Sequence, residues 1–167
     1  MLKKILVVLL IIFVLIQFYR PARNLAGQPQ PNDISKMYAV PQNVQTILDK
    51  ACYDCHSNNT KYPWYSEIQP IRFLLDDHID EGKREVNYNE FKTFLPRRQY
   101  IKLEETITQV KEGEMPLSSY TLIHSNARLT DPEKQALMGW AQNIRDTLKT
   151  TYPADSLARP KRPQGAK

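Results

Sequence analysis

The sequence predicts an all-α domain preceded by an N-terminal membrane anchor helix. Two observations favour helices: apolar residues recur at spacings of three and four along the chain, and no stretch alternates apolar and polar residues as a half-buried strand would. A third is the start signal "TDPE", in which Thr130 and Glu133 form a capping box around Pro132. With 167 residues, the chain is expected to form one domain.

The first element is the apolar run Ile5–Ile16, which two lysines precede and Phe18 and Tyr19 follow. Positive charges before such a run and aromatic residues after it are typical of a segment that enters a membrane. A cleaved signal peptide would need a small residue where Asn24 stands. We therefore interpret residues 1–20 as a retained single-pass anchor in the inner membrane, with the domain facing the periplasm. Export after cleavage is the alternative.

Composition divides the rest of the chain into three parts. Residues 21–36 are rich in Pro, Asn and Gln and are interpreted as a linker, residues 37–151 as the domain, and residues 152–167 as a disordered basic tail. The net charge of +5 comes from the two ends, which leaves the middle of the chain neutral. A balanced body does not favour a groove that follows phosphates, so no nucleic-acid partner is expected.

Four helices are predicted within the domain. The first starts with a proline, which suits a first helical turn, and carries Cys52 and Cys55 on its apolar side. The second starts at another proline and places His78 on its inner stripe, with Gly82 marking its end or a weak point within it. The approximate ranges of the four helices are 41–55, 70–82, 97–111 and 130–148.

The stretch "ACYDCH" contains both cysteines of the chain. Cys-x-x-Cys-His is the attachment signature of c-type haem. The two thiols add to the two vinyl groups at one porphyrin edge, and the adjacent histidine then places a neutral ring nitrogen on the iron. We therefore predict one haem c attached covalently through Cys52 and Cys55, with its iron bound by His56.

Two other chemistries use a Cys-x-x-Cys pair. Thiol redox exchange would need a βαβ context, whereas helices flank this pair. A zinc site would need a fourth ligand, for which only His78 or His124 is available. Both alternatives stay open, with haem favoured.

The sixth iron ligand is predicted to be Met115, in the loop "GEMPL", because a flexible thioether can reach over the porphyrin and raises the reduction potential. His78 is the alternative ligand. An open sixth site would favour sensing or peroxide chemistry instead. Trp64 and Tyr65 are expected to line the haem edge, with ordinary packing as the alternative.

The domain resembles the small haem-binding domain family of c-type cytochromes, in the blocks "CYDCHSNNTKYPWYSEIQPI", "DDHIDEGKREVNYNEF" and "GEMPLSSYTLIHSNARLTDPEKQALMGWA". The resemblance implies a cytochrome c-like helical domain around one covalently bound haem, in an anchored or exported protein. Cys52 and Cys55 match the attachment residues, His56 the proximal ligand, and Met115 the methionine of the family's Met-Pro segment. His78 lies in a matching block, which keeps it as the alternative ligand.

The expected function is one-electron transfer in the periplasm, by an electron carrier rather than an enzyme. Its partners would be redox proteins that dock transiently through a small interface. A haem-based sensor or a peroxidase-like protein, with an open or labile sixth site, is the alternative. An interaction module with a purely structural haem is a further one.

Overall fold

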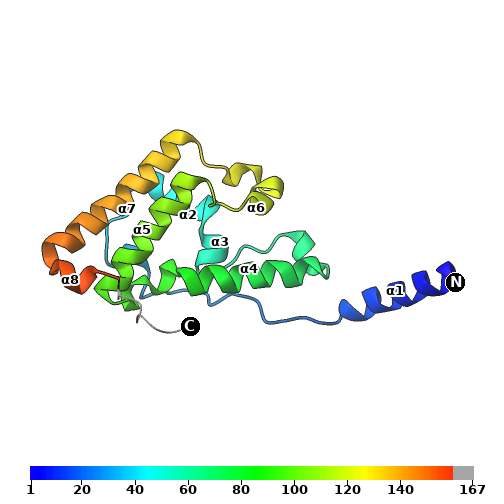
Figure 1. Cartoon of the computed structure of the whole chain (residues 1–167). Helices are drawn as coiled ribbons and strands as arrows, with labels where there is room; N and C mark the ends of the chain where they lie inside the picture. The colour runs from blue at the N-terminus through cyan, green and yellow to red at the C-terminus, as the bar shows by residue number, and fades with distance from the viewer. Residues whose placement is uncertain (160–167) are drawn as a thin grey trace, which may run out of the picture.

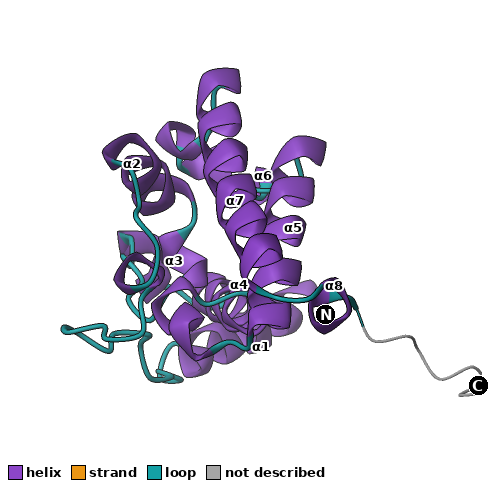
Figure 2. Ribbon diagram, turned by 90° about the vertical axis from the view of Figure 1, so that its left-hand side faces the viewer, coloured by secondary structure: helices purple, strands orange, loops and turns teal. Residues whose placement is uncertain are grey.

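A computed structural model describes residues 1–159 of the chain (Figure 1). Across this part the regular structure is helical, apart from one isolated bridge between Leu25 and Asn59 (Figure 2). The predicted all-α fold is therefore confirmed.

The elements follow one another as α1 (Leu2–Ile16), η1 (Ile34–Lys36), α2 (Gln42–Ala51), α3 (Tyr53–His56), η2 (Trp64–Glu67), α4 (Ile71–Glu85), η3 (Tyr88–Thr93), α5 (Pro96–Glu112), α6 (Ser118–Ile123), η4 (Ser125–Ala127), α7 (Asp131–Thr151) and α8 (Ala154–Leu157). Elements marked η are short 3-10 helices. The first predicted domain helix is divided in two, because the backbone leaves helical geometry at Cys52, between α2 and α3. The second is longer than predicted and continues through Gly82 to Glu85.

The core lies mainly between α5 and α7, which pack side by side along most of their length, with α2 across α7 (Figures 1 and 2). Each fully buried aliphatic side chain in this core stabilises the fold by about 1.5–3 kcal/mol. Trp140 of α7 ties the start of α2 to this core, since its indole N–H donates to the carbonyl oxygen of Ala39 at 3.0 Å. The least exposed members of the core are Ile34, Leu48, Phe91, Leu103, Ala127, Leu137 and Ala141.

The capping box predicted at the start of α7 is present. The backbone N–H of Thr130 donates to the Glu133 carboxylate at 2.9 Å, and the side chain of Thr130 caps the first turn in return. Lys50 of α2 donates to the same carboxylate at 2.6 Å. The start of α7 is therefore fixed both locally and to a neighbouring helix.

Replacing Glu133 by glutamine should lower the free energy of unfolding by about 0.5–1 kcal/mol at pH 7. The hydrogen bond from Lys50, supported by those from Thr130, lowers the pKa of the Glu133 carboxyl to about 2. Because this value lies below that of an unfolded glutamate, the contribution is complete above about pH 4.5 and is lost as the pH falls through about 2. Urea unfolding at pH 7 and near pH 2 measures both effects.

The matched control for this variant is Glu112→Gln, on an exposed position of α5 that forms no ion pair with the described residues. Its unfolding free energy should stay within about 0.5 kcal/mol of the unmodified protein. Equal losses in the two variants, or a Glu133 effect that persists near pH 2, would contradict the assignment.

Helix α1 stands apart from the body of the molecule, and its side chains are exposed along its length (Figure 1). Among residues 1–159, none of the helices combines the length and the apolar character needed to cross a membrane. The predicted anchor helix is therefore not supported by the structure.

The segment 21–36, expected to be a linker, lies against the domain. The carboxylate of Asp33 caps η1 by accepting from the backbone N–H of Ser35 at 2.8 Å, and it accepts from the side-chain amide of Asn89 at 2.6 Å. The next residue, Ile34, is fully buried in the core. The polar composition of residues 21–36 gave no signal of this packing, because their polar groups are paired with the domain rather than with water.

Part of the predicted disordered tail, residues 152–167, is also ordered. Leu157 of α8 is buried in the core, and the Arg97 side chain donates to the carbonyl oxygen of Ser156 at 3.0 Å. Arg159 pairs with Glu105 of α5 at 2.8 Å. One buried leucine and these polar contacts hold the segment up to residue 159, and the rest of the tail lies outside the described residues.

Candidate functional site

A cavity of about 510 Å³ lies between α3, α4, α5 and the loop that follows α5. We call it the central cavity. Its surface is mainly apolar, and its volume is in the range of pockets that hold organic cofactors. Its walls include Ala51, Val86, Tyr88, Thr106, Val110, Pro116, Leu117 and Leu129.

The central cavity brings together most of the predicted site residues. Cys52, Cys55 and His56 line it from the end of α2 and from α3, His78 lines it from α4, and Met115 from the loop after α5. These residues are far apart in the sequence, so the fold alone places them around one space.

The two predicted aromatic residues are not among those that line the central cavity. Trp64 is 78% exposed and packs edge-on against Tyr65, with ring centroids 6.0 Å apart. The Tyr65 hydroxyl is instead hydrogen-bonded to His124 at 2.5 Å. The structure therefore places this pair outside the cavity wall.

The break between α2 and α3 presents the cysteine motif to the cavity. The backbone N–H of Cys52 still bonds to Leu48 at 3.0 Å as the last turn of α2, while that of His56 bonds to Cys52 at 2.9 Å. Because α3 is a single turn, it aims Cys55 and His56 away from the direction of α2. A continuous helix would not direct these side chains independently of α2.

The His56 ring is held in one tautomer. Its Nδ1 lies 2.9 Å from the carbonyl oxygen of Gly82 and 3.0 Å from that of Val86, and because carbonyls can only accept, Nδ1 carries the proton. Burial lowers the pKa of His56, which keeps the ring neutral at neutral pH. The remaining nitrogen, Nε2, therefore has a lone pair available to bind a metal.

Gly82 permits the close contact between α3 and α4. A Cβ atom at this position would lie 2.8 Å from the carbonyl oxygen of Cys55 and 3.1 Å from its Cβ, closer than real side chains approach. The glycine thus allows its own carbonyl to reach His56. Sequence reasoning interpreted Gly82 as a helix end or a weak point and missed this role, because the contact joins residues far apart in the chain.

The loop that carries Met115 is held at its start and through the helix that follows it. At its start, the backbone N–H of Met115 donates to the carbonyl oxygen of Gln109 at 3.2 Å, just after Gly113 ends α5 in the left-handed conformation. In α6, which follows the loop, the Tyr120 hydroxyl donates to the Asp54 carboxylate at 2.7 Å. Asp54 lies between the two cysteines, so this bond ties the helix after the Met115 loop to the cysteine motif.

His124 supports the same connection from outside the cavity. Its ring stacks on Tyr120 with centroids 4.4 Å apart, and its Nε2 is bonded to Tyr65. No sequence signal marked Tyr120, Asp54 or His124 as a group, since each contact spans distant parts of the chain.

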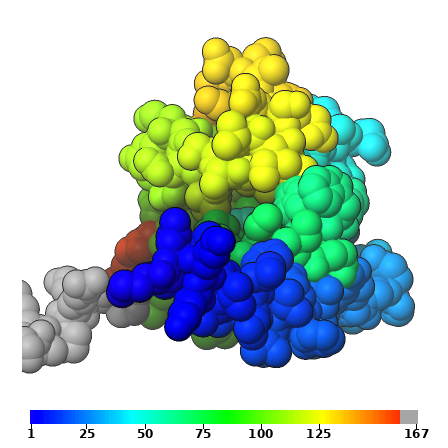
Figure 3. Space-filling view, turned by 90° about the vertical axis from the view of Figure 1, so that its right-hand side faces the viewer, coloured from blue at the N-terminus to red at the C-terminus, as the bar shows by residue number. Residues whose placement is uncertain are grey.

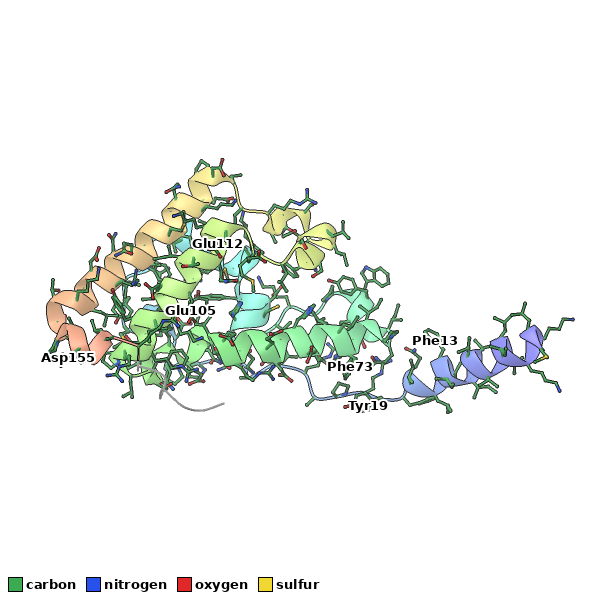
Figure 4. The ribbon with its side chains drawn as sticks, in the orientation of Figure 1. Phe13, Tyr19, Phe73, Glu105, Glu112 and Asp155 are labelled. Atoms are coloured by element: carbon green, nitrogen blue, oxygen red, sulfur yellow. The ribbon has the colours of Figure 1, made fainter. Side chains whose placement is uncertain are left out.

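The cavity wall carries one amine and four acidic residues, Asp54, Glu81, Glu85 and Glu105. Lys102 lies between Glu85 and Glu105, with 2.7 Å to each carboxylate, and it is the one lysine or arginine among the lining residues (Figure 4 labels Glu105). Burial opposes ionisation of Glu105, but hydrogen bonds from Lys102 and Arg159 outweigh it and lower the pKa of this carboxyl. This charged wall was not predicted.

The site does not fit a zinc or thiol-redox function. Within residues 1–159, no three or more His, Cys, Asp or Glu side chains are grouped so that they could hold a metal ion by themselves. Burial raises the pKa of Cys52 to about 12 and that of Cys55 to about 11, whereas redox-active cysteines have lowered values. The arrangement suits an organic group that fills the cavity and is bound by sulfur and imidazole.

Comparison with known families agrees with this geometry. The model of the family described as "Haem-binding domain" matches residues 11–143. This range extends from α1 to α7 and includes every predicted site residue. No curated protein and no solved structure matches the chain.

Proposed function

Because this chain belongs to the haem-binding domain family, we propose that its central cavity holds one haem c and that the protein transfers single electrons. The observation that carries the proposal is the fixed tautomer of His56. Two backbone carbonyls hold Nδ1–H, which leaves the neutral Nε2 as a ligand for iron.

The other residues of the cavity fit the same group. Cys52 and Cys55 form no disulfide and both border the cavity, so they are available for two thioether bonds. The apolar walls suit a large flat ring. Bound haem would supply an iron that accepts and releases one electron.

We propose Met115 as the sixth ligand. It lines the same cavity as His56, and the bond between Tyr120 and Asp54 ties the helix after its loop to the cysteine motif. A thioether on this side raises the reduction potential and closes the iron to external ligands. Both effects suit an electron carrier that docks transiently with redox proteins, rather than an enzyme.

A second candidate function follows from His78, which lines the cavity as well. As an iron ligand it would replace Met115. As an acid–base group beside an open iron it would favour a sensor or a peroxidase-like protein. An electron carrier and a sensor or peroxidase-like protein differ in whether small ligands reach the iron.

We further propose export of the domain to the periplasm, where haem c would be attached. The lysine pair in the first turn of α1, followed by an exposed apolar run, supports membrane targeting. In this proposal α1 either stays in the membrane or is removed after export.

The protein made alongside a cytochrome c maturation system should give a haem c spectrum as its pyridine haemochrome. Its mass should be that of the chain plus one haem, and the reduced form should not bind carbon monoxide rapidly. The control is Cys52→Ala combined with Cys55→Ala, which should lose the covalent mass increase. A mass of the polypeptide alone without a Soret band would refute the haem proposal, and rapid carbon monoxide binding would favour the sensor.

A further inference from the structure

One end of the domain exposes an unusual number of apolar side chains. Beyond residue 19, the described residues include eleven exposed large hydrophobic side chains, and seven of them lie in α6 or between the start of η2 and the start of α4. We call the surface formed by these seven the end face. They are Trp64, Ile68, Ile71, Phe73, Leu74, Leu122 and Ile123.

The seven side chains share one surface. Figure 3 shows α6 (yellow) and the start of α4 (green) facing the viewer together, with α1 (blue) emerging from the same side. The hydrogen bond from Tyr65 to His124 joins η2 to the end of α6, so the neighbours Trp64 and Ile123 belong to adjoining elements. The remaining four exposed hydrophobic side chains, Leu25, Met37, Leu95 and Tyr152, lie between helices in other parts of the chain.

Two stretches of the end face carry little charge, whereas Glu67 of η2 is half exposed and pairs with Arg20 and Arg23. Residues 117–127 contain no Asp, Glu, Lys or Arg, and residues 68–75 contain only Arg72. Arg72 is 2% exposed, pairs with Asp76 at 2.6 Å and lies over the Tyr62 ring. The arginine is thus turned inward, and the surface around it presents apolar side chains to the outside.

Hydrogen bonds join the end of helix α1 directly to the end face. The Gln17 side chain donates to the carbonyl oxygen of Gln69 at 3.2 Å and accepts from its backbone N–H at 2.9 Å, while the Gln69 side chain donates to Tyr19 at 3.0 Å. Gln69 lies between Ile68 and Ile71 of the end face. Figure 4 labels Tyr19 and Phe73 at the end of the domain from which α1, with Phe13, extends.

We propose that the end face rests on the surface of a lipid bilayer into which α1 inserts. This inference rests on the membrane targeting proposed above and adds the face and the orientation. Lipid fits better than a protein partner because the end face is continuous with α1, which is apolar from Ile5 onward, and carries Trp64, a residue type that favours the membrane interface. A protein partner on the end face would not explain why α1 is exposed.

The length of α1 supports the same orientation. Its 15 residues extend about 22 Å, which is less than the hydrocarbon core of a bilayer, about 30 Å. A short apolar segment draws its flanking residues toward the interface. Since Gln17 is bonded directly to Gln69, the flanking residues here include the end face itself.

The test uses the full-length holoprotein in vesicles of phosphatidylethanolamine and phosphatidylglycerol. A photo-crosslinking phenylalanine analogue replaces Trp64 or Phe73, and the control position is Leu95, which is 76% exposed beside α5, close to α8. After illumination, mass spectrometry should find several-fold more lipid adduct at positions 64 and 73 than at position 95. Unchanged haem spectra would show that the three variants are folded.

Flotation of the same vesicles separates the two proposals. Protein that floats but forms no more lipid adduct at positions 64 and 73 than at 95 would refute the end-face orientation and leave membrane attachment intact. Adducts to another polypeptide at positions 64 and 73 would identify a protein-docking surface and also refute it. Protein that does not float would refute membrane attachment, and the orientation with it.

Discussion

Replacing Met115 by alanine should remove the methionine–iron signature from the oxidised spectrum and lower the reduction potential. The loss of the thioether removes the ligand that favours the reduced iron, so a fall of roughly 0.1–0.3 V is expected, within the range that axial ligands span. The vacated position would also admit carbon monoxide rapidly. Optical and magnetic circular dichroism spectra, a redox titration and stopped-flow mixing measure the three effects.

His78→Ala is the matched control, because His78 lines the same cavity from α4. If Met115 is the ligand, this variant should keep the spectrum, the potential and the resistance to carbon monoxide. The reverse pattern, with large changes in His78→Ala and none in Met115→Ala, would assign the sixth position to His78. Rapid carbon monoxide binding by the unmodified protein would favour the sensor.

Replacing Gly82 by alanine should destabilise the protein by about 1–3 kcal/mol, although alanine is the better helix former by about 1 kcal/mol. The added Cβ would meet the carbonyl oxygen of Cys55 at 2.8 Å, and the contact is with backbone that cannot move aside freely. Moving α4 away from α3 would also withdraw the Gly82 carbonyl from His56. We therefore expect a lower melting temperature and less haem incorporated per chain.

The control for this variant is Gly139→Ala. Gly139 is also within a helix, α7, but a Cβ there would meet nothing within 4 Å. This substitution should stabilise the protein by up to about 1 kcal/mol, without altering the haem yield. The two glycine-to-alanine substitutions should thus change the stability in opposite directions. Stabilisation by Gly82→Ala would contradict the close contact of α3 with α4.

The helices could be predicted where their signals are local. The capping box set the start of α7, and the apolar stripe predicted a helix over 97–111 where α5 spans Pro96–Glu112. The polar segments on either side of the domain were harder to interpret. Ile34 and Leu157 are single apolar residues in polar surroundings, and one residue creates no periodic pattern even when the core buries it completely.

The residues around the cavity also divide into those with a local sequence signal and those without one. Cys52, Cys55 and His56 are recognisable because they are consecutive in one short motif. Lys102 and Tyr120 were not recognisable, because a charge or a hydroxyl becomes part of a site only through partners elsewhere in the chain. Trp64 shows the opposite case, since it is close to the motif in sequence but lies on the surface and is not among the residues that line the cavity.

The sequence by itself determined the helical class, the motif that can carry haem and the family to which the chain belongs. The tertiary structure decided which nitrogen of His56 faces the cavity. That choice depends on the carbonyls of Gly82 and Val86, which lie 26 and 30 residues further along the chain. These carbonyls reach the ring because a glycine lets α4 approach α3, and such a contact between distant segments has no local signal.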